Sequence, residues 1–309
     1  MTRVVIAADI GGTKCAAAIV GRTGEISDVR SAPTPGQDGP DAILRTVSGL
    51  VADLTALCAE RGLEVAGLGI GSAGIIDPDT GCVLASTEVL RDWAGVPLRA
   101  ALSERTGIAV VAVDNDVHAH ALGEAWLGAA SKASSAFFVA VGTGIGASIV
   151  IDGEIWHGER SVAGHFGHLP VPHAGVLRCV CGGSGHVEAV AAGPAMVSAH
   201  NRRTGMGLSS LAEVAVLAEA GSESAIVALD SGARALGCAV GGAVNLLDPS
   251  IVVIGGGVVG AGERWWAPME QSLRAELLPP LRDIPVVPAA LGSEAALIGA
   301  ARLAWKELG

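Results

Sequence analysis

The sequence predicts an α/β protein of two lobes, and three observations support this prediction. Predicted helices alternate with short apolar strands along the whole chain, a pattern typical of α/β folds. An apolar strand, a glycine turn and a second apolar strand occur together twice, which indicates a duplicated architecture. The chain has 309 residues. That is enough for two hydrophobic cores, because single cores stop growing at about 250–300 residues.

The first half of the chain opens with a predicted hairpin, in which strands over 3–9 and 15–20 are joined by the glycine turn 11–14. Apolar residues spaced three or four apart predict the first helix. The elements that follow the hairpin are a helix over 41–61, a strand over 65–72, a helix over 97–105, a strand over 109–113 and a helix over 116–127.

The second half repeats the opening theme. Strands over 137–141 and 147–151 flank the turn 142–146, residues 210–247 are largely helical, and a strand over 251–254 runs into three glycines. The glycine-rich segments therefore follow strands, and α/β folds bind their ligands at strand ends.

Composition excludes several classes of protein. The net charge of −11 disfavours non-specific nucleic-acid binding, which needs basic surface. Six cysteines, two of them close together and four scattered, do not form the pattern of a disulfide framework, which favours the reducing cytoplasm. The opening residues are too short for a signal peptide, and no apolar run suits a membrane span, so we expect a cytoplasmic protein with no membrane partner.

The two glycine turns are typical of phosphate-binding backbone. Gly11 and Gly12 lack a Cβ, so phosphate oxygens can approach their amides, while Thr13 and Lys14 add a hydroxyl and a cation. Asp9 is expected to hold Mg²⁺, through water. The second turn supplies Gly142, Thr143, Gly144 and Gly146. One such turn alone is more often a plain tight turn, but two, each with a Thr, favour a nucleotide site.

Three further groups have a functional and an ordinary interpretation. Asp116 could act as a general base, with Asn115 beside it, or the pair could simply cap the following helix. Glu188 could bind two sugar hydroxyls or be an ordinary exposed residue. The run Gly255, Gly256 and Gly257 could let an adenosine lie against backbone or could be a turn.

Histidines and cysteines are concentrated between residues 164 and 188. His168, Cys179, Cys181 and His186 offer the two imidazoles and two thiolates that a tetrahedral structural zinc prefers. The alternative is a glycine-rich loop in which these residues cluster by chance. We expect Trp265 and Trp266 to be packing residues, and His118 and His120 to share a helix without a metal role.

With these motifs in view, the chain resembles the ROK family of sugar kinases over essentially its whole length. The matching segments are 9–14, 114–116, 142–146, 164–188 and 245–257. The resemblance implies a two-domain actin-like, hexokinase-like ATPase fold with duplicated ribonuclease H-like lobes and a zinc-binding loop. The small lobe would be 1–115, completed by a C-terminal helix at about 296–309, and the large lobe 116–295.

The resemblance also implies an activity and its site. Asp116 would deprotonate the 6-hydroxyl of a sugar that contacts Gly74, Asn115, Asp116, His165, His168 and Glu188. ATP with Mg²⁺ would bind the two glycine turns and the 255–257 run, Zn²⁺ would be structural, and the assembly would be a homodimer.

Departures from the family pattern suggest the substrate. His165 stands where the family usually has a Glu that binds hydroxyls in mid-ring, His186 replaces a Cys, and Val89 replaces an Asn that many relatives carry. We therefore expect a modified gluco-configured hexose, with kanosamine as the named candidate. The alternatives are an ordinary glucokinase and a non-catalytic sugar sensor or regulator. The predicted strand at residue 3 leaves no room before it for a DNA-binding helix-turn-helix, and a chaperone-like ATPase would not need a zinc-anchored sugar loop.

Overall fold

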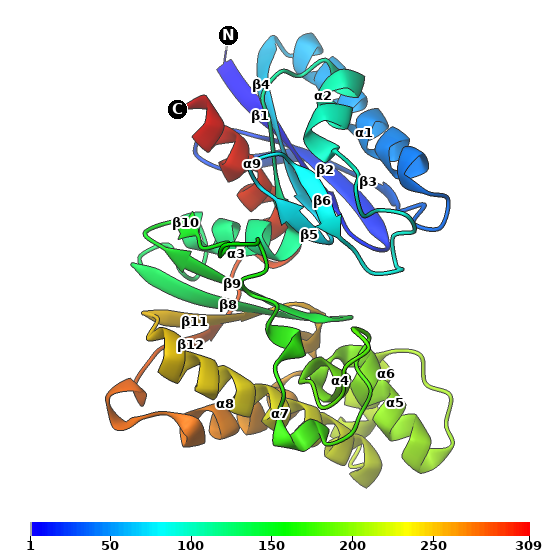
Figure 1. The fold of residues 1–309 in the computed structure, drawn as a ribbon, viewed down its shortest axis with the longest axis vertical. Helices are drawn as coiled ribbons and strands as arrows, with labels where there is room; N and C mark the ends of the chain where they lie inside the picture. The colour runs from blue at the N-terminus through cyan, green and yellow to red at the C-terminus, as the bar shows by residue number, and fades with distance from the viewer. Residues whose placement is uncertain (1) are drawn as a thin grey trace. The chain divides into compact units, whose positions relative to one another are not determined.

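The computed structural model describes residues 2–309 and divides into two compact units (Figure 1). Unit 1 comprises the chain up to Lys132 together with Gly153–Ala163 and Ala290–Gly309. Unit 2 comprises Ala133–Asp152 and Gly164–Ala289. The division differs from the predicted boundary at 115/116, because the helix that follows Asn115 packs inside unit 1 against the C-terminal helix.

Unit 1 is built on a five-stranded mixed sheet of order β3-β2-β1-β4-β7. Its strands are β1 (Thr2–Ile10), β2 (Lys14–Val20), β3 (Ile26–Pro33), β4 (Leu63–Ser72) and β7 (Val111–Asn115), with β5 (Ile75–Asp77) and β6 (Cys82–Ala85) as a separate pair and β10 (Glu154–Ile155) in the segment Gly153–Ala163. Its helices are α1 (Pro40–Glu60), α2 (Leu98–Thr106), α3 (Asp116–Trp126) and α9 (Ala295–Leu308). The predicted β1–β2 hairpin is confirmed.

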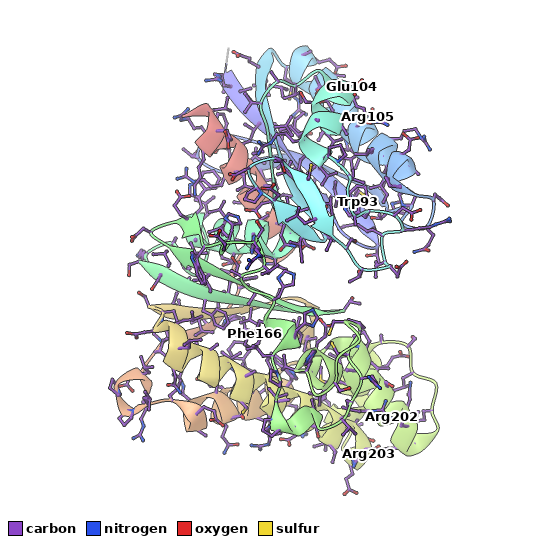
Figure 2. The ribbon with its side chains drawn as sticks, in the orientation of Figure 1. Trp93, Glu104, Arg105, Phe166, Arg202 and Arg203 are labelled. Atoms are coloured by element: carbon purple, nitrogen blue, oxygen red, sulfur yellow. The ribbon has the colours of Figure 1, made fainter. Side chains whose placement is uncertain are left out.

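Alternating side chains of β1 bury both faces of this sheet. Ile6 and Ile10 belong to the core that includes α1, whereas Val5 and Ala7 belong to a second core with α9. Trp93, labelled in Figure 2, is fully buried in the first core, and its Nε1 donates to Ser72 Oγ at 3.2 Å. The buried carboxyl end of β4 at Ser72 is therefore packed by an aromatic side chain whose indole N–H has a hydrogen-bond acceptor.

Backbone lies against backbone where α9 meets α3 and β4. A Cβ on Gly299 would lie 1.6 Å from Ala119 O, and one on Gly69 would lie 1.8 Å from Ala300 O. No L side chain fits such a distance, so these glycines permit the contact. The buried Glu124 carboxylate adds to it, accepting from the amides of Ala290 at 3.1 Å and Leu291 at 2.8 Å.

Unit 2 contains the sheet order β9-β8-β11-β12, with β8 and β9 antiparallel and β11 parallel to both β8 and β12. Its strands are β8 (Ser135–Val141), β9 (Ile145–Ile151), β11 (Ile251–Gly255) and β12 (Val286–Pro288). Its helices are α4 (Glu188–Ala191), α5 (Gly193–Thr204), α6 (Leu211–Glu219), α7 (Glu223–Leu247) and α8 (Glu263–Glu276).

The core of unit 2 joins β8 and β11 to α7 and α8. Phe166, labelled in Figure 2, packs edge-on against Phe137 of β8 with ring centroids 5.5 Å apart. Trp265 is fully buried in this core and Trp266 packs against it, which confirms the prediction that both are packing residues.

Two helices, α1 and α7, are long and apolar enough to cross a membrane by length and composition alone. Their most apolar windows are 33% and 61% buried within the protein, respectively. Because helices buried in a protein core pass the same test, this is weak evidence for a membrane span.

The glycine contact between α3 and α9 gives a test of the fold. Gly299→Ala should lower the free energy of unfolding by about 3 kcal/mol or more, because the new methyl group meets rigid backbone rather than a flexible side chain. Gly49→Ala is the matched control. Gly49 is exposed within α1, and its Cβ would meet no atom of the described residues within 4 Å, so this variant should gain about 0.5–1 kcal/mol. Urea unfolding measures both, and equal stability of the two variants would contradict the packing argument.

Candidate active site

The carboxyl ends of the parallel strands β1, β4 and β7 bring the predicted residues of unit 1 to one edge of the sheet. In register, Asp9 lies beside Gly71, and Ser72 lies beside Asn115. A Cβ on Gly71 would be 3.6 Å from Asp9 Oδ1 and 3.5 Å from the Cα of Asp116. The bare glycine thus leaves room for two carboxylates to converge.

The pKa values of Asp9 and Asp116 are both raised, that of Asp9 by burial and partly by the charge of Asp116. Burial, and then the charge of Asp116, raise the pKa of Asp9 to about 7 against a smaller opposing effect of Lys14. Burial also raises the pKa of Asp116, opposed by the amide of Val117 and the charge of His118. Asp9 Oδ1 is enclosed and has no hydrogen-bond partner among the described residues. A buried, unpaired carboxylate oxygen beside a phosphate turn suits a Mg²⁺ ion or its water ligands.

Asn115 caps helix α3, which is the ordinary reading of this residue. Its Oδ1 accepts from the amides of Val117 at 2.9 Å and His118 at 3.2 Å. Its Nδ2 donates to Gly74 O at 2.8 Å and Asp116 Oδ1 at 2.9 Å. The amide therefore links Gly74 and Asp116, two other predicted sugar contacts. Its own contact with a sugar stays a prediction.

The first glycine turn is closed by the amide of Gly11, which donates to Lys14 O at 3.1 Å. Thr13 and Lys14 are exposed at this turn. Val89 packs over it, since a Cβ on Gly12 would lie 2.5 Å from Val89 Cγ1. The hydroxyl and the ammonium group are thus presented to solvent, as a phosphate site requires.

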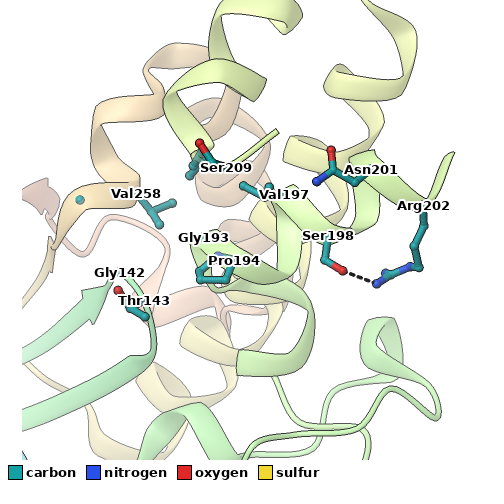
Figure 3. A pocket seen from close by; sticks show the side chains of 12 residues that line it. Gly142, Thr143, Gly193, Pro194, Val197, Ser198, Asn201, Arg202, Ser209 and Val258 are labelled. Atoms are coloured by element: carbon teal, nitrogen blue, oxygen red, sulfur yellow. Dashed lines mark hydrogen bonds between the residues drawn. The ribbon is translucent and has the colours of Figure 1, made fainter. Parts of the chain in front are cut away.

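A cavity of about 730 Å³ opens beside the second glycine turn in unit 2 (Figure 3). Three predicted residues, Gly142, Thr143 and Gly257, line it. Gly256 has a φ of 90°, and a Cβ there would lie 2.3 Å from Val141 O, so only glycine allows this approach to the turn.

Sequence reasoning missed the other wall of the cavity. It is formed by Gly193, Pro194, Val197, Ser198, Asn201 and Arg202 of α5, with Ser209, Leu211 and Val258. The amide of Gly193 donates to Gly142 O at 2.9 Å, which fixes the start of α5 at the turn. Arg202 Nη1 donates to Ser198 Oγ at 2.7 Å, and Figure 3 marks this hydrogen bond with a dashed line. The Gly-Pro pair that opens α5 is a helix-start signal, and helix N-termini attract phosphate.

Glu188 lies against the second glycine turn. Its Oε2 accepts from the amide of Ile145 at 2.7 Å and would be 2.8 Å from a Cβ on Gly144. Its Oε1 is 3.9 Å from Cys179 Sγ. This carboxylate therefore connects the turn to the cysteine-containing loop, an arrangement the sequence did not indicate. Its predicted contact with a sugar remains a prediction.

The four predicted metal ligands gather in one place. The ligand atoms of His168, Cys179, Cys181 and His186 all lie within 4.8 Å of one another. A tetrahedral zinc with bonds of about 2.0–2.3 Å separates its ligand atoms by about 3.3–3.8 Å. Cys179 Sγ lies 3.6 Å from His168 Nδ1 and Cys181 Sγ lies 3.2 Å from His186 Nδ1, so these two pairs are close to the spacing that zinc needs. A Cβ on Gly183 would lie 2.5 Å from the His186 ring, which explains the glycine there. The cluster suggests a zinc-binding loop.

His165 is exposed and directly follows Gly164, where the chain returns to unit 2. Its ring centroid lies 6.3 Å from that of His168. Gly164 before it has a φ of 89°, and a Cβ there would be 2.1 Å from Ala147 O, so β9 fixes the backbone at this point. The predicted specificity residue is thus exposed beside a predicted metal ligand.

Comparison with known proteins identifies the family. The profile described as "ROK family" matches residues 5–307. The chain belongs to the ROK family. A glucokinase of Halalkalibacterium halodurans is 32% identical over 311 residues, covering 96% of this chain and 93% of the relative. An N-acetylmannosamine kinase of Shigella flexneri is 33% identical over 304 residues, covering 98% and 99%.

A solved structure extends the likeness to three dimensions. The ROK family glucokinase from Streptomyces griseus, in complex with glucose and AMPPNP, is 31% identical, with a TM-score of 0.80 and coverage of 98% of this chain and 99% of the other. The predicted hexokinase-like α/β fold is confirmed, and the structure shows that its sheets are mixed.

The raised pKa of Asp9 makes stability depend on pH. Because its pKa is about 7 when folded and 3.8 ordinarily, its stabilising effect is complete below pH 3.8 and is lost as the pH rises through 7. Asp9→Asn should therefore be more stable than the wild type at pH 8 without Mg²⁺, and adding Mg²⁺ should stabilise only the wild type. Thermal melting at pH 5 and 8 tests this, with Asp53→Asn on the exposed face of α1 as control. A wild type insensitive to Mg²⁺ would remove Asp9 from the ion site.

Metal removal tests the zinc loop. We expect about one zinc per chain, lost in Cys179→Ser and retained in His186→Cys, since a thiolate can replace the imidazole as ligand. Chelation should lower the melting temperature and zinc should restore it. Cys82→Ser, a half-buried cysteine of unit 1, is the control. The zinc content of each protein is measured by emission spectrometry. Equal zinc in the wild type and the three variants would refute the assignment of these residues as zinc ligands.

Proposed function

We propose that this ROK protein transfers the γ-phosphoryl group of ATP to the 6-hydroxyl of a gluco-configured hexose. The chain is a sugar kinase, as are the glucokinases and the N-acetylmannosamine kinase that it is similar to. The observation that carries the finer proposal is the convergence of Asp9 and Asp116 beside the exposed Lys14. One carboxylate suits Mg²⁺, and the other suits proton removal from a hydroxyl.

The donor half of the proposal rests on unit 2. ATP is the proposed donor, because the cavity beside the second glycine turn adjoins a helix N-terminus and the S. griseus relative binds AMPPNP. Gly144, Gly146, Gly255 and Gly256 are proposed to let phosphate and ribose approach backbone, together with the glycines that line the cavity. Mg²⁺ supplies charge neutralisation of the phosphates. Zn²⁺ is proposed as a structural ion only.

The acceptor half rests on Gly74, Asn115, His165, His168 and Glu188, each a proposed sugar contact. Asp116 takes the proton of the 6-hydroxyl, and its raised pKa favours that transfer. His165, in the place of the family's usual Glu, replaces an anionic acceptor by an imidazole that both donates and accepts. An amino sugar such as kanosamine fits this change, because a neutral imidazole nitrogen can accept from the amine. We further propose a cytoplasmic homodimer.

A panel of sugars tests the substrate. Specificity constants are measured through ADP release with glucose, kanosamine, glucosamine, N-acetylglucosamine, N-acetylmannosamine and allose. We expect kanosamine to exceed glucose, and His165→Glu to move the ranking back towards glucose. A preference for glucose of about tenfold or more would make the protein an ordinary glucokinase. No ADP release with any sugar would favour the sensor reading.

Asp116→Asn tests the base. Turnover should fall by about a hundredfold or more, while sugar affinity stays within about tenfold, because the amide keeps the shape but cannot take a proton. Calorimetric titration of the sugar separates binding from turnover. Retained turnover would remove Asp116 from the proposed role.

A further inference from the structure

Asp114, two residues before the proposed base, is a buried carboxylate that accepts three hydrogen bonds. Only 1% of the residue is exposed. Oδ1 accepts from the amide of Asn115 at 2.7 Å and bonds His118 Nδ1 at 2.8 Å, and Oδ2 bonds His157 Nε2 at 2.7 Å. An ion this deeply buried costs several kcal/mol unless it is paired. Three donors offset that cost.

The three donors come from different parts of unit 1. The Asn115 amide belongs to the junction of β7 and α3, His118 lies one turn along α3, and His157 lies in the segment Gly153–Ala163. The two rings meet edge-on, with centroids 5.1 Å apart. Asp114 thus ties the junction of β7 and α3, which contains Asp116, to the segment Gly153–Ala163. That segment lies about 40 residues further along the chain.

The electrostatics agree with an ionised Asp114. Burial raises its pKa, but the hydrogen bonds and charges of His118 and His157 outweigh burial and bring the pKa down to about 2. Because the carboxylate has no proton to give, each ring must donate its own. His118 also acts on the proposed base, since its charge lowers the pKa of Asp116.

We propose that Asp114, His118 and His157 form a positioning network that holds the Asn115–Asp116 junction in place for proton transfer, with His157 as its pH-sensitive member. The proposal rests on the proposed role of Asp116 as general base. None of the three residues need touch the sugar, so they act through Asp116.

A metal ion is the competing use of the same residues. Their ligand atoms lie within 4.8 Å of one another, and two imidazoles with a carboxylate can bind zinc. The observed N···O separations of 2.7 and 2.8 Å are shorter than the roughly 3.3 Å that ligands of a tetrahedral zinc keep. Direct hydrogen bonds explain the geometry, and Oδ1 already accepts two.

Four groups facing His157 decide when it carries a charge. They are Asp114 on β7, the ring of His118 on α3, Asp79 in the turn between β5 and β6, and Lys306 on α9. Burial lowers the pKa of His157, but the hydrogen bond and charge of Asp114, with Asp79, raise it overall against Lys306. The ion pair is therefore complete below the ordinary value of 6.5 and is lost as the pH rises through the raised pKa.

The experiment compares pH profiles of kcat and KM with the best hexose of the panel. The wild type should lose kcat on the alkaline side with little change in hexose KM. His157→Gln keeps an uncharged donor like that of the neutral ring, so its kcat should not change with pH on the alkaline side and should lie within about threefold of the level that the wild type reaches there. His157→Ala should lower kcat by about tenfold or more, the effect of losing a hydrogen bond to a charged group.

Asp79→Asn is the matched control for charge. Asp79 is exposed and influences His157 only through space, so its removal should leave the plateau of kcat unchanged and move the alkaline loss to lower pH. Nitrogen-15 NMR of the histidines should show the same downward shift in the titration of His157. These two measurements report the charge of His157 rather than the stability of the fold.

Three results would overturn the network. One is an alkaline loss that persists unchanged in His157→Gln. Another is a melting temperature lowered in His157→Ala with kcat intact. The third is a second equivalent of metal that disappears in Asp114→Asn while the Cys179 site stays loaded, which would make these residues a metal site. Retained turnover in Asp116→Asn refutes the base itself and leaves the titration of His157 measurable by NMR, so the two failures are distinguishable.

Discussion

Negative charge gathered at the carboxyl edge of β1, β4 and β7 is the constraint on which unit 1 depends. Asp9, Asp114 and Asp116 all reach this edge, because parallel strands end together and Gly71 leaves the space between them open. Each carboxylate is stabilised differently. Asp114 is paired with two histidines, Asp116 accepts from an amide and from Asn115, and Asp9 keeps an oxygen that has no hydrogen-bond partner in the described part of the chain. The result is one group whose pKa is lowered beside two whose pKa values are raised, an arrangement typical of proton-transfer chemistry.

The candidate site of unit 2 is built mainly from backbone groups, whereas that of unit 1 is built mainly from side chains. The turn after β8, the glycines after β11 and the start of α5 bring amides and a helix N-terminus to one cavity. Such groups favour an anion without burying a full positive charge. Glu188 then links this turn to the loop of Cys179 by accepting the Ile145 amide. One loop thus supports both the proposed phosphate turn and the proposed sugar contacts of unit 2.

Local signals made much of this predictable. Apolar runs between glycines gave β1, β2, β8 and β11 to within a few residues, and the periodic apolar positions of α1 gave its length. The His and Cys spacing gave a cluster whose ligand atoms do come together. Strand β3 was missed because most of its residues are exposed and it lacks an apolar pattern. The α5 wall of the cavity was missed because residues such as Val197 and Asn201 are ordinary on a helix.

The sequence by itself determined the chemistry available: which carboxylates, imidazoles, thiols and bare backbone positions the chain carries, and that they follow strands. Only the tertiary structure decided which partners each of these groups has, and therefore which role each can take. It made Asn115 a helix cap, paired Asp114 with His157 across a long stretch of sequence, and left Oδ1 of Asp9 without a hydrogen-bond partner among residues 2–309. The reason is physical, since hydrogen-bond partners and desolvation depend on which chain segments meet, and distant segments meet only through the packed sheet and its glycine contacts.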